Sequence, residues 1–189
     1  MEKSSRGITG REVLGKKVLI LGEAGSGKTR LASRLIQDLT AVINPKEVVV
    51  IDLAPPRRGV FGGKISDYVD LKGEVRYLSP KRVYTPRLAG RSGGEVLRYA
   101  ELNRESMEPL FKEFLRSPSK VLVVNDITLY LHAGNLETVL ECVKLAETFL
   151  ATAYYGVKLA EDFGTGISVR EKVLTEKLAQ HMDLVVQIS

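Results

Sequence analysis

The sequence is poor in cysteine, and this scarcity limits the chemistry and the compartment of the protein. Cys142 is the only cysteine among 189 residues, so one chain can form neither a disulfide framework nor a cysteine-based zinc site. A reducing cytoplasm is therefore the expected compartment. Cys142 lies in the apolar segment 140–143, and we interpret it as part of the core, because free cysteine packs like a small apolar side chain.

A long apolar run is also missing from the sequence. No run approaches the roughly 20 residues that a membrane-spanning helix requires, so we expect no membrane partner. The segment 1–7 carries charge without an apolar stretch behind it, unlike a secretory signal. We expect residues 1–15 to form a flexible basic arm ahead of a single domain over 16–189.

Repeats that interleave basic and aromatic residues are absent too. The chain has a net charge of +5, but its lysines and arginines are dispersed, which is weak support for nucleic-acid binding. Positive charge also attracts the phosphates of a nucleotide. Four asparagines and three glutamines, against 28 lysines and arginines, give a composition typical of thermophilic proteins.

Apolar strands alternate with amphipathic helices through most of the chain. Near-continuous apolar runs predict strands that are covered on both faces, at 17–21, 47–52, 120–125, 147–155 and 183–188. Helical spacing of apolar residues occurs between them, at 28–40, 92–117, 136–145 and from 168 to about 182. This order predicts an α/β, three-layer fold: a mostly parallel sheet of about five strands with helices on both faces.

Residues 53–92 interrupt the alternation with many prolines and glycines. Short extended pieces are expected there only near 65–71 and 74–78. Long irregular segments inside a compact domain are commonly functional, so we interpret 53–92 as a lid-like insert. Ser92 to Glu95 and Ser168 to Glu171 each have the capping-box spacing that predicts the start of a helix. Pro109 predicts a kink or a division in the first of these helices.

A glycine-rich turn connects the first predicted strand to the first predicted helix. Residues 22–29 read GEAGSGKT and fill every fixed position of the pattern GxxxxGK[ST]. Glycines let the backbone curl so that successive N–H groups face phosphate oxygens, and the helix start adds its positive dipole end. In this pattern Lys28 reaches the β- and γ-phosphates, and the Thr29 hydroxyl binds Mg²⁺.

This turn, together with its strand and helix, resembles the P-loop NTPase superfamily, and the resemblance implies a Walker A motif at 22–29. The implied ligands are a nucleoside triphosphate and Mg²⁺. The residues implied to contact them are Gly22, Glu23, Ala24, Gly25, Ser26, Gly27, Lys28, Thr29 and Arg30. The usual guanine-reading motif Asn-Lys-x-Asp is absent, which favours ATP over GTP.

Acidic residues stand at the ends of two predicted strands. Asp126 follows KVLVVN and resembles a Walker B aspartate, and Asp52 ends EVVVID. Asp52 resembles the acid after the second strand in the ATPase family of MinD and dethiobiotin synthetase. Ligands of open α/β sheets bind outside the carboxyl ends of strands, so Asp126 and Asp52 are candidate catalytic and metal-holding residues beside Thr29.

Two positions differ from the patterns of known ATPase families. Ile127 follows Asp126, so the water-activating glutamate of motor-like ATPases is absent there, and Glu23 replaces the signature lysine of the MinD-type loop. The chain is similar to the adenosylcobinamide kinase family in the order of residues 125–131, 164–167, Arg170, 178–179 and 183–185. That family carries a histidine nucleophile upstream of its Walker B region. The two histidines here are His132 and His181, and we interpret His132 as a polar loop or core residue.

Basic residues of the insert are candidates for contacting phosphates, because arginine matches phosphate geometry and stabilises charge during phosphoryl transfer. They are Arg57, Arg58, Lys64, Arg82, Arg87 and Arg91, with Arg87 and Arg91 preferred as catalytic residues. Arg170, Asn125 and residues 154–156 are further candidates to line the site.

Three functions agree with these residues. The favoured one is a Mg-dependent ATPase or ATP-operated switch. The alternatives are a small-molecule or nucleotide kinase, and a non-catalytic nucleotide-binding module associated with nucleic acid. The identity of the phosphate acceptor or protein partner is left open, and so is a homodimer.

Overall fold

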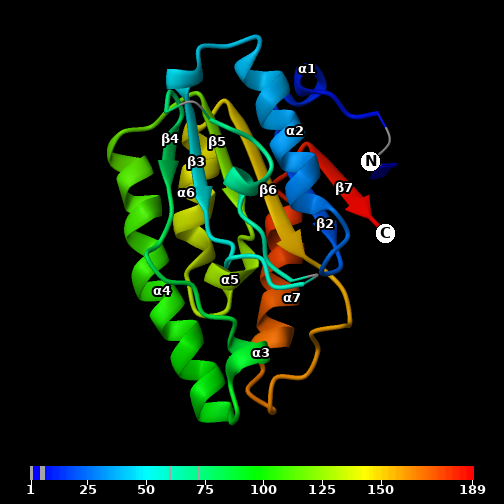
Figure 1. Ribbon diagram of the computed structural model, residues 1–189, viewed down its shortest axis with the longest axis vertical. Coiled ribbons are helices and arrows are strands. Elements are labelled where there is room, and N and C mark those ends of the chain that lie inside the picture. The colour runs from blue at the N-terminus through cyan, green and yellow to red at the C-terminus, as the bar shows by residue number, and fades with distance from the viewer. Residues whose placement is uncertain (1, 5–6, 60, 72) are drawn as a thin grey trace.

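The protein is built around a seven-stranded sheet whose strand pairings are all parallel (Figure 1). The computed structural model describes residues 2–4, 7–59, 61–71 and 73–189. The strands follow the order β1-β7-β2-β6-β5-β3-β4 across the sheet. Their bounds are β1 Glu2–Ser4, β2 Lys17–Gly22, β3 Val48–Asp52, β4 Arg76–Leu78, β5 Val121–Asn125, β6 Thr148–Tyr154 and β7 Leu184–Ile188. The predicted α/β fold is confirmed, with β1 and β4 added at the sheet edges to the five strands expected.

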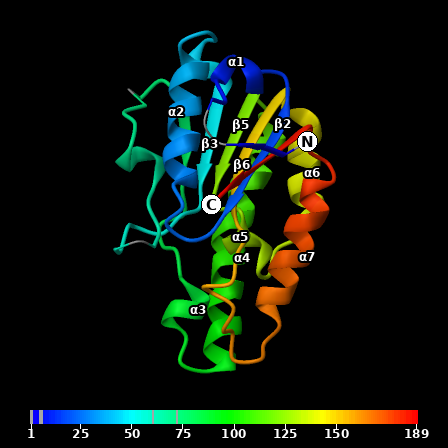
Figure 2. The same cartoon turned by 90° about the vertical axis from the view of Figure 1, so that its right-hand side faces the viewer.

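Helices cover both faces of the sheet, as the continuous apolar strands predict. The longer helices are α2 Lys28–Thr40, α4 Gly93–Arg116, α6 Leu136–Leu145 and α7 Ile167–Ala179. The short ones are α1 Gly10–Val13, α3 Pro86–Ala89 and α5 Thr128–Leu131, together with the 3₁₀ turns η1 Pro45–Glu47 and η2 Ile65–Asp67. Turned by 90°, the molecule shows α2 on one side of the sheet and α4, α6 and α7 on the other (Figure 2).

Alternate residues of each strand supply the two halves of the core. In β2, Leu19 and Leu21 pack with residues of α4, α5 and α6, whereas Val18 and Ile20 pack with residues of α1 and α2. This separation follows from the strand geometry, because successive side chains point to opposite faces. The helix α4 runs unbroken through Pro109, since its buried Met107, Phe111 and Phe114 hold it against the sheet. The expected division at Pro109 is therefore wrong.

The carboxyl ends of the strands meet at one edge, and the irregular segment lies there. In Figure 1 the strand arrows point down, toward α3, α5 and the loops between β3 and α4. The predicted piece at 74–78 corresponds to β4, but residues 65–67 form the 3₁₀ turn η2 instead of an extended segment. An Asp67 carboxylate oxygen accepts a hydrogen bond from the Lys64 backbone N–H at 2.8 Å, which favours this local turn.

The segment 1–15 differs from the expected flexible arm in its described residues. Residues 2–4 extend the sheet beside β7, and residues 7–15 carry α1 against α2. Ile8 and Val13 are buried, and the backbone N–H of Gly10 donates to the Asp38 carboxylate at 2.9 Å. Burial of apolar residues gives this segment the packing that its charged first residues did not predict. No helix among the described residues is both long and apolar enough to span a membrane.

Candidate functional site

The glycine-rich loop, residues 22–29, connects β2 to α2 at the carboxyl edge of the sheet. Gly25 and Gly27 have φ angles of +79° and +94°, a left-handed conformation that glycine adopts without strain. A Cβ on Gly22 would lie 2.5 Å from the carbonyl oxygen of Ile188. Gly27 is the N-cap of α2 and offers no side-chain cap, so the first turn presents backbone N–H groups at the loop.

Lys28 folds back onto its own loop. Its Nζ donates hydrogen bonds to the carbonyl oxygens of Gly22 at 2.9 Å and Glu23 at 2.6 Å. Burial lowers the pKa of Lys28 below its ordinary value, and the charge of the Asp126 carboxylate opposes that shift. Lys28 and Asp126 both line the same cavity, and the charge of each acts on the other.

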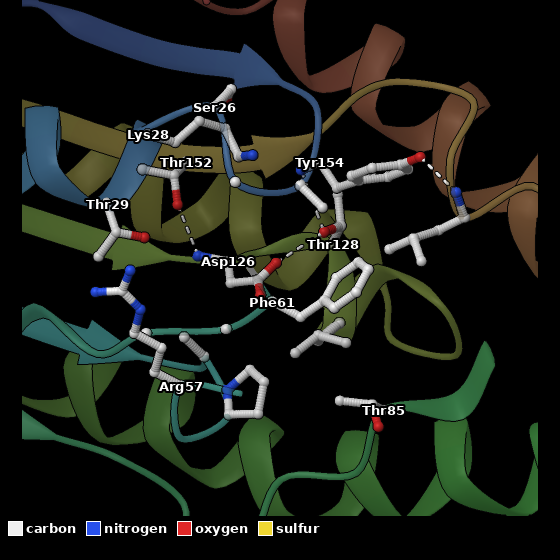
Figure 3. Close-up of a pocket in the computed structure, with 18 of the residues that line it drawn as sticks. Ser26, Lys28, Thr29, Arg57, Phe61, Thr85, Asp126, Thr128, Thr152 and Tyr154 are labelled. Carbon is white, nitrogen blue, oxygen red and sulfur yellow. Dashed lines mark hydrogen bonds between the residues drawn. The ribbon is translucent and has the colours of Figure 1, made fainter. Parts of the chain in front are cut away.

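Asp126 directly follows β5 in a strained backbone conformation. Its φ is +59°, a left-handed value that is uncommon for a residue other than glycine. The conformation is held by its backbone N–H, which donates to Thr152 Oγ1 at 2.8 Å, and by its Oδ1, which accepts from Thr128 Oγ1 at 3.1 Å (Figure 3). Burial raises the pKa of Asp126, and Lys28 opposes this effect. A left-handed backbone combined with a half-buried acid of raised pKa is typical of a functional position.

Asn125 joins the two sides of the site through its side-chain amide. Its Oδ1 accepts hydrogen bonds from the hydroxyls of Thr29 at 3.2 Å and Thr152 at 2.8 Å. Its Nδ2 donates to Asp52 Oδ1 at 3.0 Å and to the carbonyl oxygen of Gly63 at 3.2 Å. The hydroxyl expected at Mg²⁺, Thr29, is thus connected through one buried side chain to the insert.

Asp52 does not face the cavity, where a second metal-holding carboxylate was expected. It is fully buried and is not among the residues that line the cavity beside the loop. Besides Asn125, it accepts hydrogen bonds from the backbone N–H groups of Ala54 at 3.3 Å and Ile65 at 2.7 Å, and from the Tyr77 hydroxyl at 2.6 Å. Because four donors occupy its two oxygens, Asp52 anchors the insert beneath the site instead of facing a metal.

A cavity of about 390 Å³ lies between the glycine-rich loop and the insert. Residues 24–30 form one wall, and Arg57 and Phe61 come from the opposite one (Figure 3). The cavity continues past Asp126 to residues 85–88 and to His132. It is therefore larger than the space beside the loop alone, and its second end lies against α3 and α5.

The basic residues proposed in the insert divide into two groups. Arg57 and Arg87 line the cavity, and so does Arg30 from the first turn of α2. Arg91 is exposed and lies outside the lining, and its backbone N–H donates to the Glu95 carboxylate at 2.8 Å as α4 begins. Of the two preferred arginines, the structure therefore places Arg87 at this cavity and Arg91 outside it. Arg58, Lys64 and Arg82 also lie outside the lining.

Arg87 lines the cavity with its charge already paired. Its guanidinium donates two parallel hydrogen bonds to the Glu171 carboxylate, at 3.0 and 2.8 Å, and a third to Ser168 Oγ at 3.1 Å. The guanidinium carbon lies 5.2 Å from the centre of the Tyr154 ring. Such a forked, stacked arrangement holds the side chain rigidly in the wall.

The same carboxylate contacts a histidine. His132 Nε2 lies 2.5 Å from Glu171 Oε2, and both side chains are almost fully buried. The sequence interpretation of Glu171 as a capping residue is wrong, since α7 begins at Ile167 with Gly166 as its N-cap. The buried residues of α7 are Ile167, Glu171, Thr175 and Leu178, whose helical spacing places Glu171 on the core face. Two of these four residues are polar, so the sequence has no apolar pattern that indicates this face.

Two other sequence candidates play structural parts. Arg170 donates to the carbonyl oxygens of Leu131 at 3.1 Å and Gly134 at 2.7 Å, which ties α7 to the end of α5. Tyr154 lines the cavity, as considered from the sequence, and its hydroxyl accepts from the Leu159 backbone N–H at 2.8 Å.

The donor set agrees with a magnesium ion more than with a metal that prefers nitrogen or sulfur ligands. Among the described residues, no group of three or more His, Cys, Asp or Glu is arranged to hold a metal. Thr29 and Asp126 both line the cavity beside Lys28 and offer hard oxygen ligands. Mg²⁺ is commonly held by one or two such side chains together with substrate phosphates and water.

Comparison with solved structures agrees with this architecture. The fold is similar to that of flagellar accessory protein FlaH from Methanocaldococcus jannaschii, with a TM-score of 0.50 and 12% identity, covering 92% of this chain and 70% of FlaH. A structure described only by its project label, PH0250, from Pyrococcus horikoshii OT3 gives a TM-score of 0.44 with 10% identity, covering 96% of this chain and 88% of that chain. Pif1 helicase from Candida albicans gives 0.43 with 13% identity, covering 95% and 37%.

No protein-family model matches the sequence, and a search of curated proteins gives no match. The similarity to FlaH, together with the parallel sheet and its helical cover, shows that the chain has an α/β fold of the P-loop NTPase-like kind.

Proposed function

We propose that the protein binds ATP with Mg²⁺ at the glycine-rich loop and transfers the terminal phosphoryl group to a small acceptor in the adjoining cavity. The observation that carries this proposal is the extent of the cavity, which begins at residues 24–30 and continues past Asp126 to α3 and α5. Hydrolysis requires room for the nucleotide and one water molecule, whereas transfer also requires room for an acceptor beyond the γ-phosphate. The extension of the lining past Asp126 supports such an acceptor.

The residues of the loop have the chemistry that this reaction requires. Backbone N–H groups at the start of α2 and the ammonium group of Lys28 would neutralise the phosphates, with Lys28 exchanging its bonds to Gly22 and Glu23 for phosphate oxygens. Thr29 and Asp126 would hold Mg²⁺, which supplies charge neutralisation at the transferred group when bound. Arg30 and Arg57 line the cavity and are exposed, so both are available to a phosphate.

The reaction is a displacement at phosphorus. An acceptor hydroxyl forms the new P–O bond, the bond between the γ-phosphorus and the β–γ bridging oxygen breaks, ADP departs, and the hydroxyl proton passes to solvent. Ile127 is buried and supplies no carboxylate at the position where motor-like ATPases carry a water-activating glutamate. This chemistry favours transfer over hydrolysis.

An ATP-operated switch is the second candidate, and one contact favours it. Thr29 donates to Asn125, which in turn donates to Asp52 and to the carbonyl oxygen of Gly63 in the insert. Engagement of the Thr29 hydroxyl by Mg²⁺ would alter its bond to Asn125. The insert could thereby respond to the state of the nucleotide.

Product analysis with ATP labelled at the γ-phosphate separates the candidates. The protein is incubated with Mg²⁺ and a panel of acceptors (sugars, nucleosides and simple alcohols), and labelled product and free phosphate are both measured. Labelled product that is absent with Lys28→Ala and present with Lys144→Ala, an exposed lysine on α6, supports transfer. Phosphate release that no acceptor changes overturns transfer in favour of the switch. Absence of both products favours the non-catalytic module.

A further inference from the structure

Two side chains from different elements lie beside the first turn of α2, at one end of the cavity. Arg30 belongs to that turn, and Tyr68 is the C-cap of the 3₁₀ turn η2 in the insert. Both residues line the cavity. Because η2 packs against α2, the Arg30 guanidinium carbon lies 6.0 Å from the centre of the Tyr68 ring. A planar cation and the face of an aromatic ring are therefore opposite each other here.

Tyr68 has a supported backbone and an accessible ring. Its backbone N–H donates to the carbonyl oxygen of Ile65 at 3.0 Å, and the Ile65 N–H donates in turn to the buried Asp52 carboxylate at 2.7 Å. A Cβ on Gly63 would lie 3.7 Å from the Tyr68 ring, so backbone packs against the ring edge. The ring is half-buried, and Arg30 lies at the outer limit of a cation–π contact. The face of the ring is therefore open to a flat group.

The glycine-rich loop sets the direction in which a bound nucleotide extends. In the proposed transfer site, Lys28 holds the β- and γ-phosphates, and Thr29 and Asp126 hold the Mg²⁺ that bridges these two phosphates. In Figure 3, Thr29 lies on one side of Asp126, and Thr128, toward the second end of the cavity, lies on the other. The γ-phosphate and the acceptor would occupy the Asp126 side. The α-phosphate and the nucleoside would then extend the opposite way, past Arg30, which directly follows Thr29 in α2.

Amide side chains, the usual readers of the adenine edge, are missing from the described lining of the cavity. None of the described lining residues is Asn, Gln or Glu, and the one carboxylate among them is that of Asp126. Base identity is read by hydrogen bonds to base edges, whereas stacking needs only the π face that every base has. Arg30 lies over the Tyr68 ring, where its guanidinium would meet the face of a stacked base. This end of the cavity therefore suits the face of a base more than its edge.

We infer that Arg30 and Tyr68 form the subsite for the base of the nucleoside triphosphate, with the base stacked on Tyr68 and the exposed Arg30 side chain moved outward over its second face. Adenine and guanine nucleotides then bind with similar affinity, and uracil nucleotides, whose single ring stacks over less area, bind more weakly. The absence of Asn-Lys-x-Asp indicates in this light a site that accepts either purine. The inference rests on the proposed function only in that a triphosphate binds at the glycine-rich loop, and the fate of the γ-phosphate does not affect it.

Calorimetric titration in the presence of Mg²⁺ measures the dissociation constants of ATP, GTP, UTP and inorganic tripolyphosphate, which supplies three phosphates without a base. We expect the values for ATP and GTP to lie within about threefold of each other, with UTP weaker than both. A difference of more than about tenfold between ATP and GTP overturns the shared purine site. Binding of tripolyphosphate but of none of the nucleotides overturns the base subsite and leaves the phosphate-binding loop intact. If none of the four binds, the proposed function fails and the inference fails with it.

Replacement of the Tyr68 ring separates the contribution of the base from that of the phosphates. Tyr68→Ala is expected to weaken ATP and GTP binding about tenfold, the effect of losing one stacked base, and to leave tripolyphosphate binding unchanged. Tyr68→Phe keeps the ring and should keep the affinity. Tyr99→Ala, which removes a half-buried ring of α4 outside the cavity lining, is the matched control and should bind like wild type. Equal ATP affinities in Tyr68→Ala and Tyr99→Ala would contradict the subsite, and so would an equal loss of ATP and tripolyphosphate binding in Tyr68→Ala.

Nuclear magnetic resonance detects the stack itself and does not depend on how Tyr68→Ala folds. The chain has seven tyrosines, and with tyrosine-specific ¹³C labelling the signal that is missing from Tyr68→Phe identifies Tyr68. The ring current of a stacked base should shift the Tyr68 ring signals upfield with either ATP or GTP, whereas tripolyphosphate should leave them in place. Equal shifts from ATP and tripolyphosphate would overturn the stack. Arg30→Ala should weaken ATP more than tripolyphosphate, and equal losses would remove Arg30 from the base subsite.

Discussion

Arg87 and Glu171 form a buried ion pair that joins α3 to α7, with 6% and 5% of their side chains exposed and with oxygen–nitrogen distances of 3.0 and 2.8 Å. The two residues are 84 positions apart in the sequence. The pair fixes the insert to the body of the domain at the point where the cavity ends. Burial makes the two charges costly to desolvate, and it also makes the pair rigid, because a buried charge is tolerated only with a closely matched partner.

Removal of one member of this pair should destabilise the fold. We expect Arg87→Met to lower the free energy of unfolding by about 3 kcal/mol or more, because it leaves the Glu171 carboxylate buried without its guanidinium partner. Urea denaturation measures the change. Arg104→Met, which breaks exposed pairs with Glu101 and Glu108 on α4, is the control and should have little effect. Equal losses in the two variants would contradict the assignment.

Replacement of Asp52 should separate anchoring from metal binding. Asp52→Asn replaces one acceptor oxygen by a donor amide, so the Ile65 N–H or the Tyr77 hydroxyl loses its partner. We expect a loss of about 2–3 kcal/mol in the free energy of unfolding, measured with urea, and a smaller loss of about 1 kcal/mol for Tyr77→Phe. The Mg²⁺ dependence of ATP binding should survive in Asp52→Asn. Its disappearance there would return Asp52 to the metal site.

The sheet and the loop could be predicted from local patterns, and the particular residues explain why. The continuous apolar runs at 17–21 and 120–125 are short and bounded by turns, which is typical of buried parallel strands. The glycine-rich loop is contiguous in sequence, so its residue pattern predicts most of its backbone conformation, including the positive φ of Gly27. The edge strand β4 has three residues, and β1 depends on pairing with β7, so neither has a strong local signal.

The far end of the cavity could not be predicted because it depends on contacts between distant segments. Glu171 has the spacing of a capping residue after Ser168, and its actual role depends on Arg87 and His132, which lie in other elements. The strand-end position of Asp52 was correctly identified, yet sequence does not reveal the Tyr77 hydroxyl that occupies its carboxylate. Long-range partners, more than residue types, decide which of two similar acids faces the cavity.

The half-buried acid at the end of β5, Asp126, should make the stability of the fold depend on pH in a definite direction. The pKa of Asp126 is raised in the folded state, so the folded protein binds more protons than the unfolded one above pH of about 3.8. The contribution of Asp126 to stability therefore falls as pH rises from that value to its folded pKa. Asp126→Asn lacks this contribution, and asparagine also tolerates a positive φ.

Denaturation of wild type and Asp126→Asn across this acidic range measures the difference between their free energies of unfolding. The stability of wild type relative to the variant should decrease as pH increases. A difference that is independent of pH, or one that grows with pH, would mean that burial does not disfavour the charged carboxylate. The variant should also bind ATP with reduced dependence on Mg²⁺, since one proposed ligand has lost its charge.

Close packing at the end of α5 makes Gly134 sensitive to substitution. A Cβ there would lie 2.4 to 2.6 Å from ring atoms of the fully buried Tyr130. Gly134→Ala is expected to lower the free energy of unfolding by about 1–3 kcal/mol through overpacking, as measured by thermal or urea denaturation. Gly94→Ala, in the first turn of α4 with its nearest contact at 3.9 Å, should be neutral or slightly stabilising. Reversal of this order would contradict the packing around Tyr130.

Calorimetric titration of ATP, with Mg²⁺ and with a chelator, tests the central claim that the glycine-rich loop binds Mg·ATP. Wild type is compared with Lys28→Ala and with the exposed-lysine control Lys144→Ala. We predict saturable, Mg-dependent binding in wild type and in Lys144→Ala, and its loss in Lys28→Ala. This variant should remain folded, because among the described residues the hydrogen bonds of Lys28 go to carbonyl oxygens of its own loop. Undiminished binding by a folded Lys28→Ala protein would contradict the account.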